Sequence, residues 1–196
     1  MDPNSRTSVS MLQGLRDQDP EQWDRFVQLY GPLVYEWCRR RGIGEHDAAD
    51  IVQEVFRAVS NRIATFRKER PHDTFGGWLR KITHFKVADH FRRQAKRVVA
   101  RGGSTANLRL KTIAFDVSET ADETELALDK HSLYMRALEL LESSFEPRTW
   151  QAFWSVAVED QPAQSVAETL KMTPGAVHNA KYKVLKRLRT EFEDLL

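Results

Sequence analysis

Apolar residues recur at intervals of three and four positions along most of this chain of 196 residues. This interval is the period of an amphipathic α-helix, because side chains at such spacings lie on one face. No stretch of the sequence shows a convincing alternation of apolar and polar residues or an Asn-Gly hairpin turn, the two signs of β-structure. The pattern therefore predicts an all-α fold class.

The first predicted helices lie between residues 19 and 44. Asp19 followed by Pro20 indicates a helix start, because aspartate caps free N–H groups and proline is tolerated at the first helical position. Gly31-Pro32 is expected to interrupt this helix, and a second helix is expected to end at the turn that contains Gly42. The residues expected to face the core are Trp23, Phe26, Val27, Tyr30, Leu33, Val34 and Trp37.

Two longer helices complete the predicted N-terminal domain. One spans about residues 47–63, and the other follows a polar loop and begins after a cap at Thr74. Because these helices can bury a shared core, we place one domain at residues 20–97, preceded by an N-terminal tail or first helix at residues 1–19. The apolar face of the last helix is expected to include Phe75, Trp78, Leu79, Ile82, Phe85 and Phe91.

Residues 98–122 are predicted to be a flexible linker that contains Gly102-Gly103. Residues 90–115 include no Asp or Glu, whereas residues 116–129 are acidic and include no Lys or Arg. Blocks of one charge sign are typical of solvated segments, and basic blocks often contact nucleic acid. The whole chain has 30 basic and 28 acidic residues, so its net charge of +2 does not by itself indicate a partner.

The C-terminal domain, residues 123–196, is predicted to contain a helix-turn-helix. Helices are expected at residues 123–141 and 147–158, and the motif itself begins at Ala163, with the small Ala167 ten residues before Val177. Two steeply crossing helices need a small residue where their backbones approach, and apolar residues that fix the angle. Lys171 stands where such turns favour glycine, so a left-handed conformation there would cost about 1 kcal/mol.

The second helix of the motif is expected to bind duplex DNA through a basic face. An α-helix fits the major groove, where Asn pairs with adenine and Lys or Arg with guanine. Alternatively, cations gather at a helix C-terminus because they suit the dipole, but that effect is confined to the last turn, whereas the charges begin at Lys181. The predicted surface consists of Thr173, Gly175, His178, Asn179, Lys181, Tyr182, Lys183, Lys186 and Arg187.

Two stretches of the N-terminal domain are candidate interaction sites. The helix at residues 47–59 has a polar face, either simply solvated or used for protein docking, that carries Asp50, Gln53, Glu54 and Arg57. Residues 73–97 alternate aromatic and basic side chains, which together can stack unpaired bases and hold their phosphates, although the rings could equally be core. The candidates there are Phe75, Trp78, Arg80, Lys81, His84, Arg92 and Arg93.

Three stretches together resemble the sigma-70 family of bacterial RNA polymerase sigma factors, in its extracytoplasmic-function (ECF) group. "DAADIVQEVF" is similar to the region-two helix that docks on the polymerase clamp, and "TFGGWLRKITHFKVADHFRR" to the element that melts and recognises the minus-ten promoter region. "SVAETLKMTPGAVHNAKYKVLKRLR" is similar to the region-four helix-turn-helix that recognises the minus-thirty-five element. The segment "EPRTWQAFW" departs from the usual leucine-rich start of region four, and we interpret Trp150, Phe153 and Trp154 mainly as core.

The resemblance implies core RNA polymerase and promoter DNA, both duplex and non-template single strand, as partners. Polymerase contacts would come from Asp50, Gln53, Glu54 and Arg57. The loop at residues 67–74, which includes Arg67 and Lys68, would hold a flipped promoter base. Factors of this group are commonly restrained by anti-sigma proteins, so a regulator of that kind is expected. The non-template strand would follow Arg80, Lys81, His84, Arg92 and Arg93.

No catalytic residue, metal site, cofactor or small-molecule substrate is expected. The six histidines are scattered, and the sequence contains no HExxH or paired-cysteine ligand set. Cys38 is the single cysteine, and neither a secretory leader nor a long apolar run occurs, so we expect a cytoplasmic protein without membrane insertion.

The alternative to a sigma factor is a helix-turn-helix regulator that acts on duplex DNA without binding core polymerase.

Overall fold

The computed structural model describes residues 10–70, 73–100 and 123–195. Nearly all of these residues lie in helices, and no strand occurs among them. The predicted all-α class is therefore confirmed. Most of the predicted linker, residues 101–122, lies outside the described residues.

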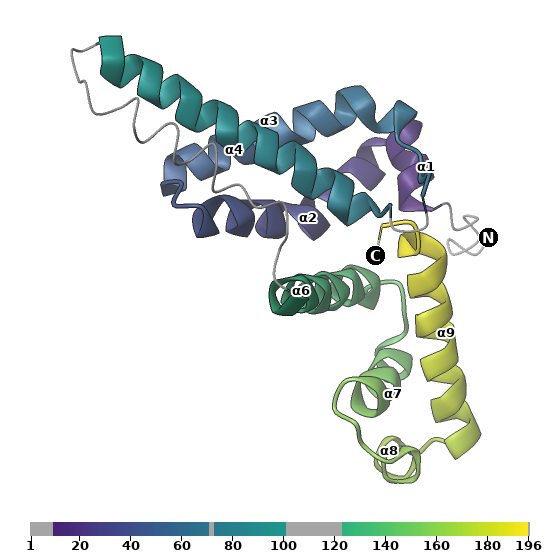
Figure 1. The fold of residues 1–196 in the computed structure, drawn as a ribbon. Helices are drawn as coiled ribbons and strands as arrows, with labels where there is room; N and C mark the ends of the chain where they lie inside the picture. Colours follow the sequence, from purple (N-terminus) through teal and green to yellow (C-terminus); the bar gives the residue numbers. More distant parts are fainter. Residues whose placement is uncertain (1–9, 71–72, 101–122, 196) are drawn as a thin grey trace.

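The N-terminal module consists of four α-helices and a short 3-10 helix (Figure 1). Its elements are α1 (Met11–Arg16), α2 (Pro20–Arg40), α3 (Glu45–Arg62), η1 (Ile63–Thr65) and α4 (Phe75–Ala100). The predicted caps are present, since the Asp19 carboxylate accepts hydrogen bonds from the first N–H groups of α2 and the Thr74 hydroxyl accepts one from the Gly77 N–H. Gly42 has a φ of +78° in the turn after α2, a conformation that glycine adopts without steric cost.

The predicted interruption at Gly31-Pro32 is wrong, because α2 continues through Pro32 to Arg40. Proline inside a helix costs about 3 kcal/mol through a lost hydrogen bond and a steric clash. The helix on both sides of Pro32 buries large side chains in the same core, among them Phe26, Tyr30 and Trp37. Each such side chain contributes about 1.5–3 kcal/mol on burial, so their sum exceeds the cost of the proline.

Two residues assigned to the core are exposed. Val27 is 42% exposed, because it lies about 100° around α2 from the buried Phe26. Phe85 is 56% exposed, on a different face of α4 from the buried Leu79 and Ile82. A spacing of three or four residues predicts which side chains share a face of the helix. It does not predict which face the neighbouring helices cover.

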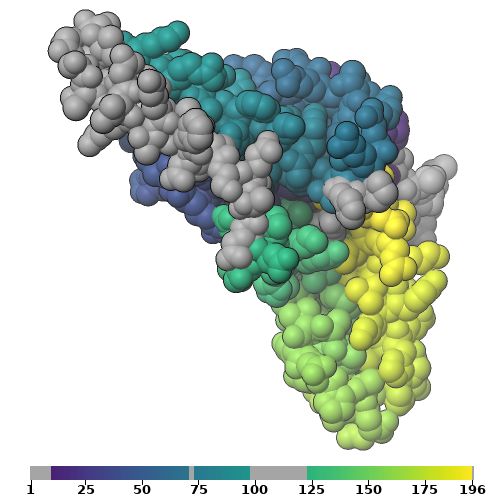
Figure 2. All heavy atoms as spheres, viewed as in Figure 1, coloured from purple at the N-terminus to yellow at the C-terminus, as the bar shows by residue number. Residues whose placement is uncertain are grey.

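The C-terminal module contains α6 (Glu123–Glu142), α7 (Pro147–Ala157), α8 (Ala163–Leu170) and α9 (Pro174–Phe192). The helices predicted at residues 123–141 and 147–158 are thus confirmed within one residue. Trp150 and Phe153 are buried and Trp154 packs partly buried against them, which confirms the interpretation of these rings as core. The helices α7 and α8 and the beginning of α9 project away from the N-terminal module (Figures 1 and 2).

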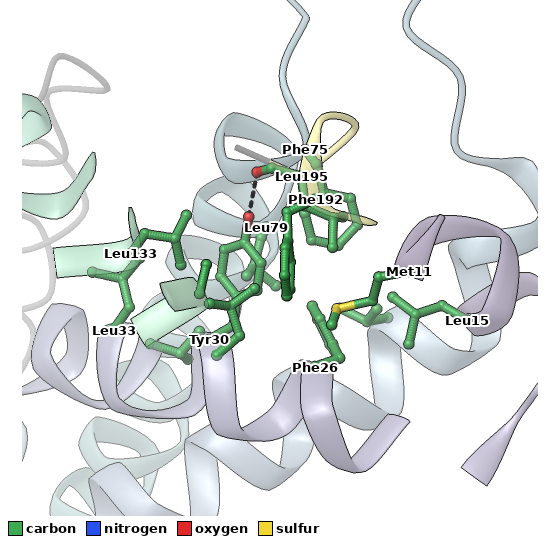
Figure 3. Close-up of a cluster of buried hydrophobic side chains, with 14 of the residues drawn as sticks. Met11, Leu15, Phe26, Tyr30, Leu33, Phe75, Leu79, Leu133, Phe192 and Leu195 are labelled. Carbon is green, nitrogen blue, oxygen red and sulfur yellow. Dashed lines mark hydrogen bonds between the residues drawn. The ribbon is translucent and has the colours of Figure 1, made fainter. Parts of the chain in front are cut away.

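The two modules share one hydrophobic core, in which α6 and the end of α9 pack against the N-terminal helices. Figure 3 shows Tyr30 and Leu33 of α2 beside Leu133 of α6, with Phe192 and Leu195 from the end of the chain in the same cluster. The Tyr30 hydroxyl donates a hydrogen bond of 2.6 Å to the Leu195 carbonyl oxygen. Burial raises the pKa of Tyr30 above its ordinary value, so the phenol stays neutral and remains a donor.

Candidate nucleic-acid interface

The helix-turn-helix has the predicted construction. Val166 and Ala167 of α8 pack against Val177 and Ala180 of α9, and all four residues are buried in one cluster. Ala167 is the small residue at which the two helices meet. Thr173 caps α9, since its hydroxyl accepts a hydrogen bond of 3.2 Å from the Ala176 N–H. The sequence therefore predicted both the helices and the cap of this motif.

Lys171 has the left-handed conformation that the glycine-like turn requires, with φ of 51° and ψ of 47°. Arg148 of α7 compensates for part of this cost. Its guanidinium donates a hydrogen bond of 2.9 Å from Nε to the Leu170 carbonyl, and further bonds to the carbonyls of Leu170 and Lys171. These carbonyls end α8, where no intrahelical N–H is available to them. Sequence reasoning missed Arg148, because no local pattern links residues that lie 22 and 23 positions apart.

The basic face of α9 points outward. The side chains of its buried stripe, which includes Val177, Ala180 and Val184, fill the core, whereas the predicted recognition residues lie on the other side. Lys181 is half-buried, and Arg187 is tied to Glu191 by an ion pair within α9. The exposed residues are Thr173, Gly175, His178, Asn179, Tyr182, Lys183 and Lys186.

The polar face of α3 is exposed at Asp50, Gln53 and Arg57, whereas Glu54 is paired with α4. Lys86 Nζ lies 3.3 Å and Arg93 Nη2 3.1 Å from the Glu54 carboxylate. Burial opposes the charge on Glu54, but the hydrogen bonds from Lys86 and Arg93 outweigh it and hold the pKa of this carboxyl below its ordinary value. Glu54 is therefore ionised at neutral pH and ties α3 to the basic part of α4.

The cations predicted to follow single-stranded DNA occupy different environments. Arg67 and Lys68 are exposed in the loop before α4, and Lys81 is exposed on α4 itself. Arg92 and Arg93 are also exposed, although Arg92 pairs with Asp89 and Arg93 with Glu54. His84 is half-buried, with Nδ1 at 3.2 Å from Nη1 of Arg41. Arg80 is 19% exposed and lies in the interface with α6.

The two aromatic candidates lie mainly in the core. Phe75 is 1% exposed and packs against the rings of Phe26, Tyr30, Phe66 and Trp78. In this arrangement no face of the Phe75 ring is open to a base. Trp78 is half-buried at the edge of the same cluster.

Phe85 is an exposed aromatic residue that sequence reasoning assigned to the core. Lys81 lies four residues before it and Arg92 seven residues after it, so all three belong to one face of α4. A ring that is 56% exposed between two exposed cations is the arrangement that base stacking and phosphate contacts require. The sequence could have indicated this exposure, because the residues next to Phe85 are polar.

The described residues offer neither a metal site nor a helix that could span a membrane. Among the residues that the structure describes, no group of three His, Cys, Asp or Glu side chains could hold a metal ion. Within the same ranges, every helix is too short or too polar to cross a lipid bilayer.

The geometry defines a class of protein: a two-module all-helical protein with a basic helix-turn-helix and a second, basic and aromatic helix face on α4. Comparison with known proteins extends this assignment. The family model described as Sigma-70 region 2 matches residues 26–97, which contain most of α2, all of α3 and most of α4. This segment is therefore similar to region 2 of the sigma-70 family, which includes the extracytoplasmic-function (ECF) group.

Two relatives carry the name of this group. The ECF RNA polymerase sigma factor SigE of Mycolicibacterium smegmatis is 32% identical over 74 residues, which are 38% of this chain and 27% of SigE. The ECF RNA polymerase sigma factor BldN of Streptomyces coelicolor is 23% identical over 190 residues, which are 95% of this chain and 66% of BldN. The chain thus spans less than two thirds of the length of either relative.

Proposed function

We propose that this chain is a transcription initiation factor that binds core RNA polymerase, directs it to particular promoters and assists promoter opening. The observation that carries the proposal is the match to sigma-70 region 2 over residues 26–97, the segment in which α3 and α4 present their polar, basic and aromatic faces. The separate helix-turn-helix supplies a second DNA contact. A regulator that binds only duplex DNA would leave the exposed faces of α3 and α4 without a role.

The proposed mechanism is a division of labour between the modules. The exposed α3 residues Asp50, Gln53 and Arg57, together with Glu54, contact core polymerase. The loop with Arg67 and Lys68 and the basic face of α4 hold unpaired bases and their phosphates. The basic face of α9 lies in the major groove of the upstream duplex.

Trapping unpaired bases lowers the cost of strand separation. Unstacking a base costs a few kcal/mol, and each base stacked on an aromatic ring regains about 1–3 kcal/mol. The factor therefore acts by binding rather than by turnover, and we expect it to act in the cytoplasm, where an anti-sigma protein or a similar regulator restrains it.

The proposal is tested by reconstituting transcription. Purified chain mixed with core RNA polymerase is expected to form a stoichiometric complex on gel filtration and to start transcription at discrete positions on genomic fragments. Core polymerase alone serves as the control. Duplex binding by the chain without complex formation would replace the proposal with the regulator hypothesis.

Replacing Phe85 is expected to weaken binding to single-stranded DNA. Phe85→Ala removes one stacking ring, which at about 1–3 kcal/mol per base corresponds to an affinity loss of roughly 5- to 150-fold. Fluorescence anisotropy with a labelled single-stranded oligonucleotide measures this loss. Phe85→Trp keeps an aromatic face and should retain the affinity, whereas an unchanged affinity in Phe85→Ala would show that the ring does not contact a base.

A further inference from the structure

The interface between the two modules contains a buried carboxylate, Asp129 of α6, which is 6% exposed. Its hydrogen-bond partners among the described residues all belong to the N-terminal module. Trp37 Nε1 donates to Oδ2 at 2.7 Å, Arg80 Nη2 donates to the same oxygen at 2.6 Å, and Arg40 Nη1 donates to Oδ1 at 3.0 Å. The Arg80 guanidinium also lies over the Trp37 ring, 5.0 Å from its centroid. The Arg80 guanidinium and the Trp37 ring thus support each other's orientation.

These three donors form an anion site that belongs to α2 and α4 and receives its anion from α6. Two guanidinium groups brought this close repel each other unless an anion lies between them. Guanidinium groups bind phosphate as well as carboxylate, because both present oxygens that match the N–H fork. The chemistry of the site therefore also fits a DNA backbone phosphate. Arg80 lies one residue before Lys81, on the helix proposed to hold single-stranded DNA.

The other ion pairs between described residues of the two modules have the same sign pattern. Arg25 of α2 lies 2.5 Å from Glu191 of α9, and Lys68 lies 3.8 Å from Asp194. Glu125 of α6 lies 2.8 Å from Arg40 and 3.8 Å from Arg80. In each pair the N-terminal module supplies the cation and the C-terminal module the carboxylate. The C-terminal module therefore covers positive charge that a polyanion would also attract.

The arrangement is also too compact for simultaneous binding of both promoter elements. The contacts of Phe75 with Tyr30 and of Tyr30 with Leu195, together with the helix rise of about 1.5 Å per residue, keep Phe85 within about 65 Å of Pro174. Elements centred about 25 base pairs apart are separated by about 85 Å along B-DNA. A chain that binds both elements has to separate its two modules.

We infer that Trp37, Arg40 and Arg80 form a phosphate site for single-stranded promoter DNA, and that Asp129 occupies this site in the free chain and adds to the shared core in holding the two modules together. This inference rests on the proposed function. Entry of the DNA phosphate displaces the Asp129 carboxylate, releases α6 from α2 and lets the helix-turn-helix move to the upstream duplex. The closed chain consequently binds single-stranded DNA more weakly than an opened chain does.

The test measures opening and affinity in the full-length chain. Gln28 of α2 and Gln151 of α7 are exposed and are replaced by cysteine for a pair of fluorophores, with the buried Cys38 replaced by alanine. Adding a single-stranded oligodeoxynucleotide to this otherwise unaltered chain is expected to lower energy transfer between the fluorophores. A duplex of the same length is expected to leave it unchanged, because the α9 face is already exposed. No change with the single strand, or an equal change with the duplex, would overturn the inference.

Asp129→Asn tests the carboxylate directly. It keeps the size of the side chain, removes the charge that Arg40 and Arg80 share, and is expected to lower energy transfer without DNA. If the closed form outnumbers the open form ten to one, it should also raise the affinity for the oligonucleotide by about tenfold. Adding Arg80→Gln to this variant should abolish the gain. Glu139→Gln, an exposed change of equal charge on the same helix, is the matched control.

The outcomes separate the inference from the proposed function. Unchanged transfer and affinity in Asp129→Asn, or an affinity gain that survives Arg80→Gln, would overturn the phosphate site. Circular dichroism verifies that each variant keeps its helix content, and the DNA titration of the unaltered chain decides the matter if Asp129→Asn does not fold. Because these measurements contain no polymerase, failure of the chain to bind core polymerase would remove the proposed function and leave the result at Asp129 intact.

Discussion

Replacing Lys181, Lys183 and Lys186 together by alanine is expected to lower duplex affinity by about two orders of magnitude at 0.1 M salt. The three ammonium groups lie on α9, with Lys183 and Lys186 exposed and Lys181 half-buried beside them. Each phosphate contact releases condensed counterions, so each lost contact reduces the slope of log K against log salt by about 0.9. The slope should therefore become shallower by about 2.7 units. Anisotropy titrations between about 50 and 200 mM salt measure both quantities.

The matched control keeps the charge. Replacing the same three lysines by arginine preserves the phosphate contacts, so the salt slope should remain that of the unaltered chain. A slope unaffected by the alanine changes would show that this face of α9 does not bind DNA. A slope reduced equally by the arginine changes would show that the alanine result came from altered packing rather than from lost charge.

Replacing Phe26 by alanine is expected to destabilise the chain by about 3–5 kcal/mol. Phe26 is fully buried, and its ring centroid lies 5.2–5.7 Å from those of Trp23, Tyr30, Phe56 and Phe75. Removing the ring leaves a cavity among side chains that belong to three helices and cannot all move inward. Because native proteins are stable by only about 5–15 kcal/mol, this change removes a large share of the free energy of unfolding. Guanidinium chloride unfolding followed by circular dichroism measures it.

The same substitution at an exposed ring shows whether the loss of stability depends on the buried position or only on the loss of a phenyl ring. Phe85→Ala deletes the same atoms from a side chain that is 56% exposed, and exposed changes usually alter stability by no more than about 0.5 kcal/mol. Comparable destabilisation by the two substitutions would contradict the assignment of Phe26 to the core and of Phe85 to the surface. With Phe85→Ala stable, its effect on single-stranded DNA can be attributed to the lost ring face.

Local signals in the sequence predicted most of the individual helices. The caps at Asp19, Thr74 and Thr173 depend on side chains that bond to backbone groups two or three residues away, so their positions are fixed by short stretches. The left-handed Lys171 was also predictable, because the spacing of apolar residues around it leaves room for one sharp turn. The continuation of α2 through Pro32 was not predictable in this way, since the burial that outweighs the cost of the proline involves distant segments.

For the candidate site, the sequence predicted which residue types gather on which helix but not which of them face solvent. Phe75 and Phe85 both follow the helical spacing of apolar residues on α4, and the packing of α2 and α3 buries the first and exposes the second. Arg80 and Lys81 are adjacent basic residues, and contact with Asp129 of α6 distinguishes them. These differences arise between residues far apart in the chain, and a local pattern contains no information about them.

The sequence by itself determined the helical class, the helix-turn-helix and the basic face of α9, because each depends on period, spacing and capping within a few turns of helix. The tertiary structure alone decided that the two modules share a core and that Asp129 covers Arg40 and Arg80. Such contacts join segments separated by 49 and 89 positions, and only the packing of the whole chain brings them together.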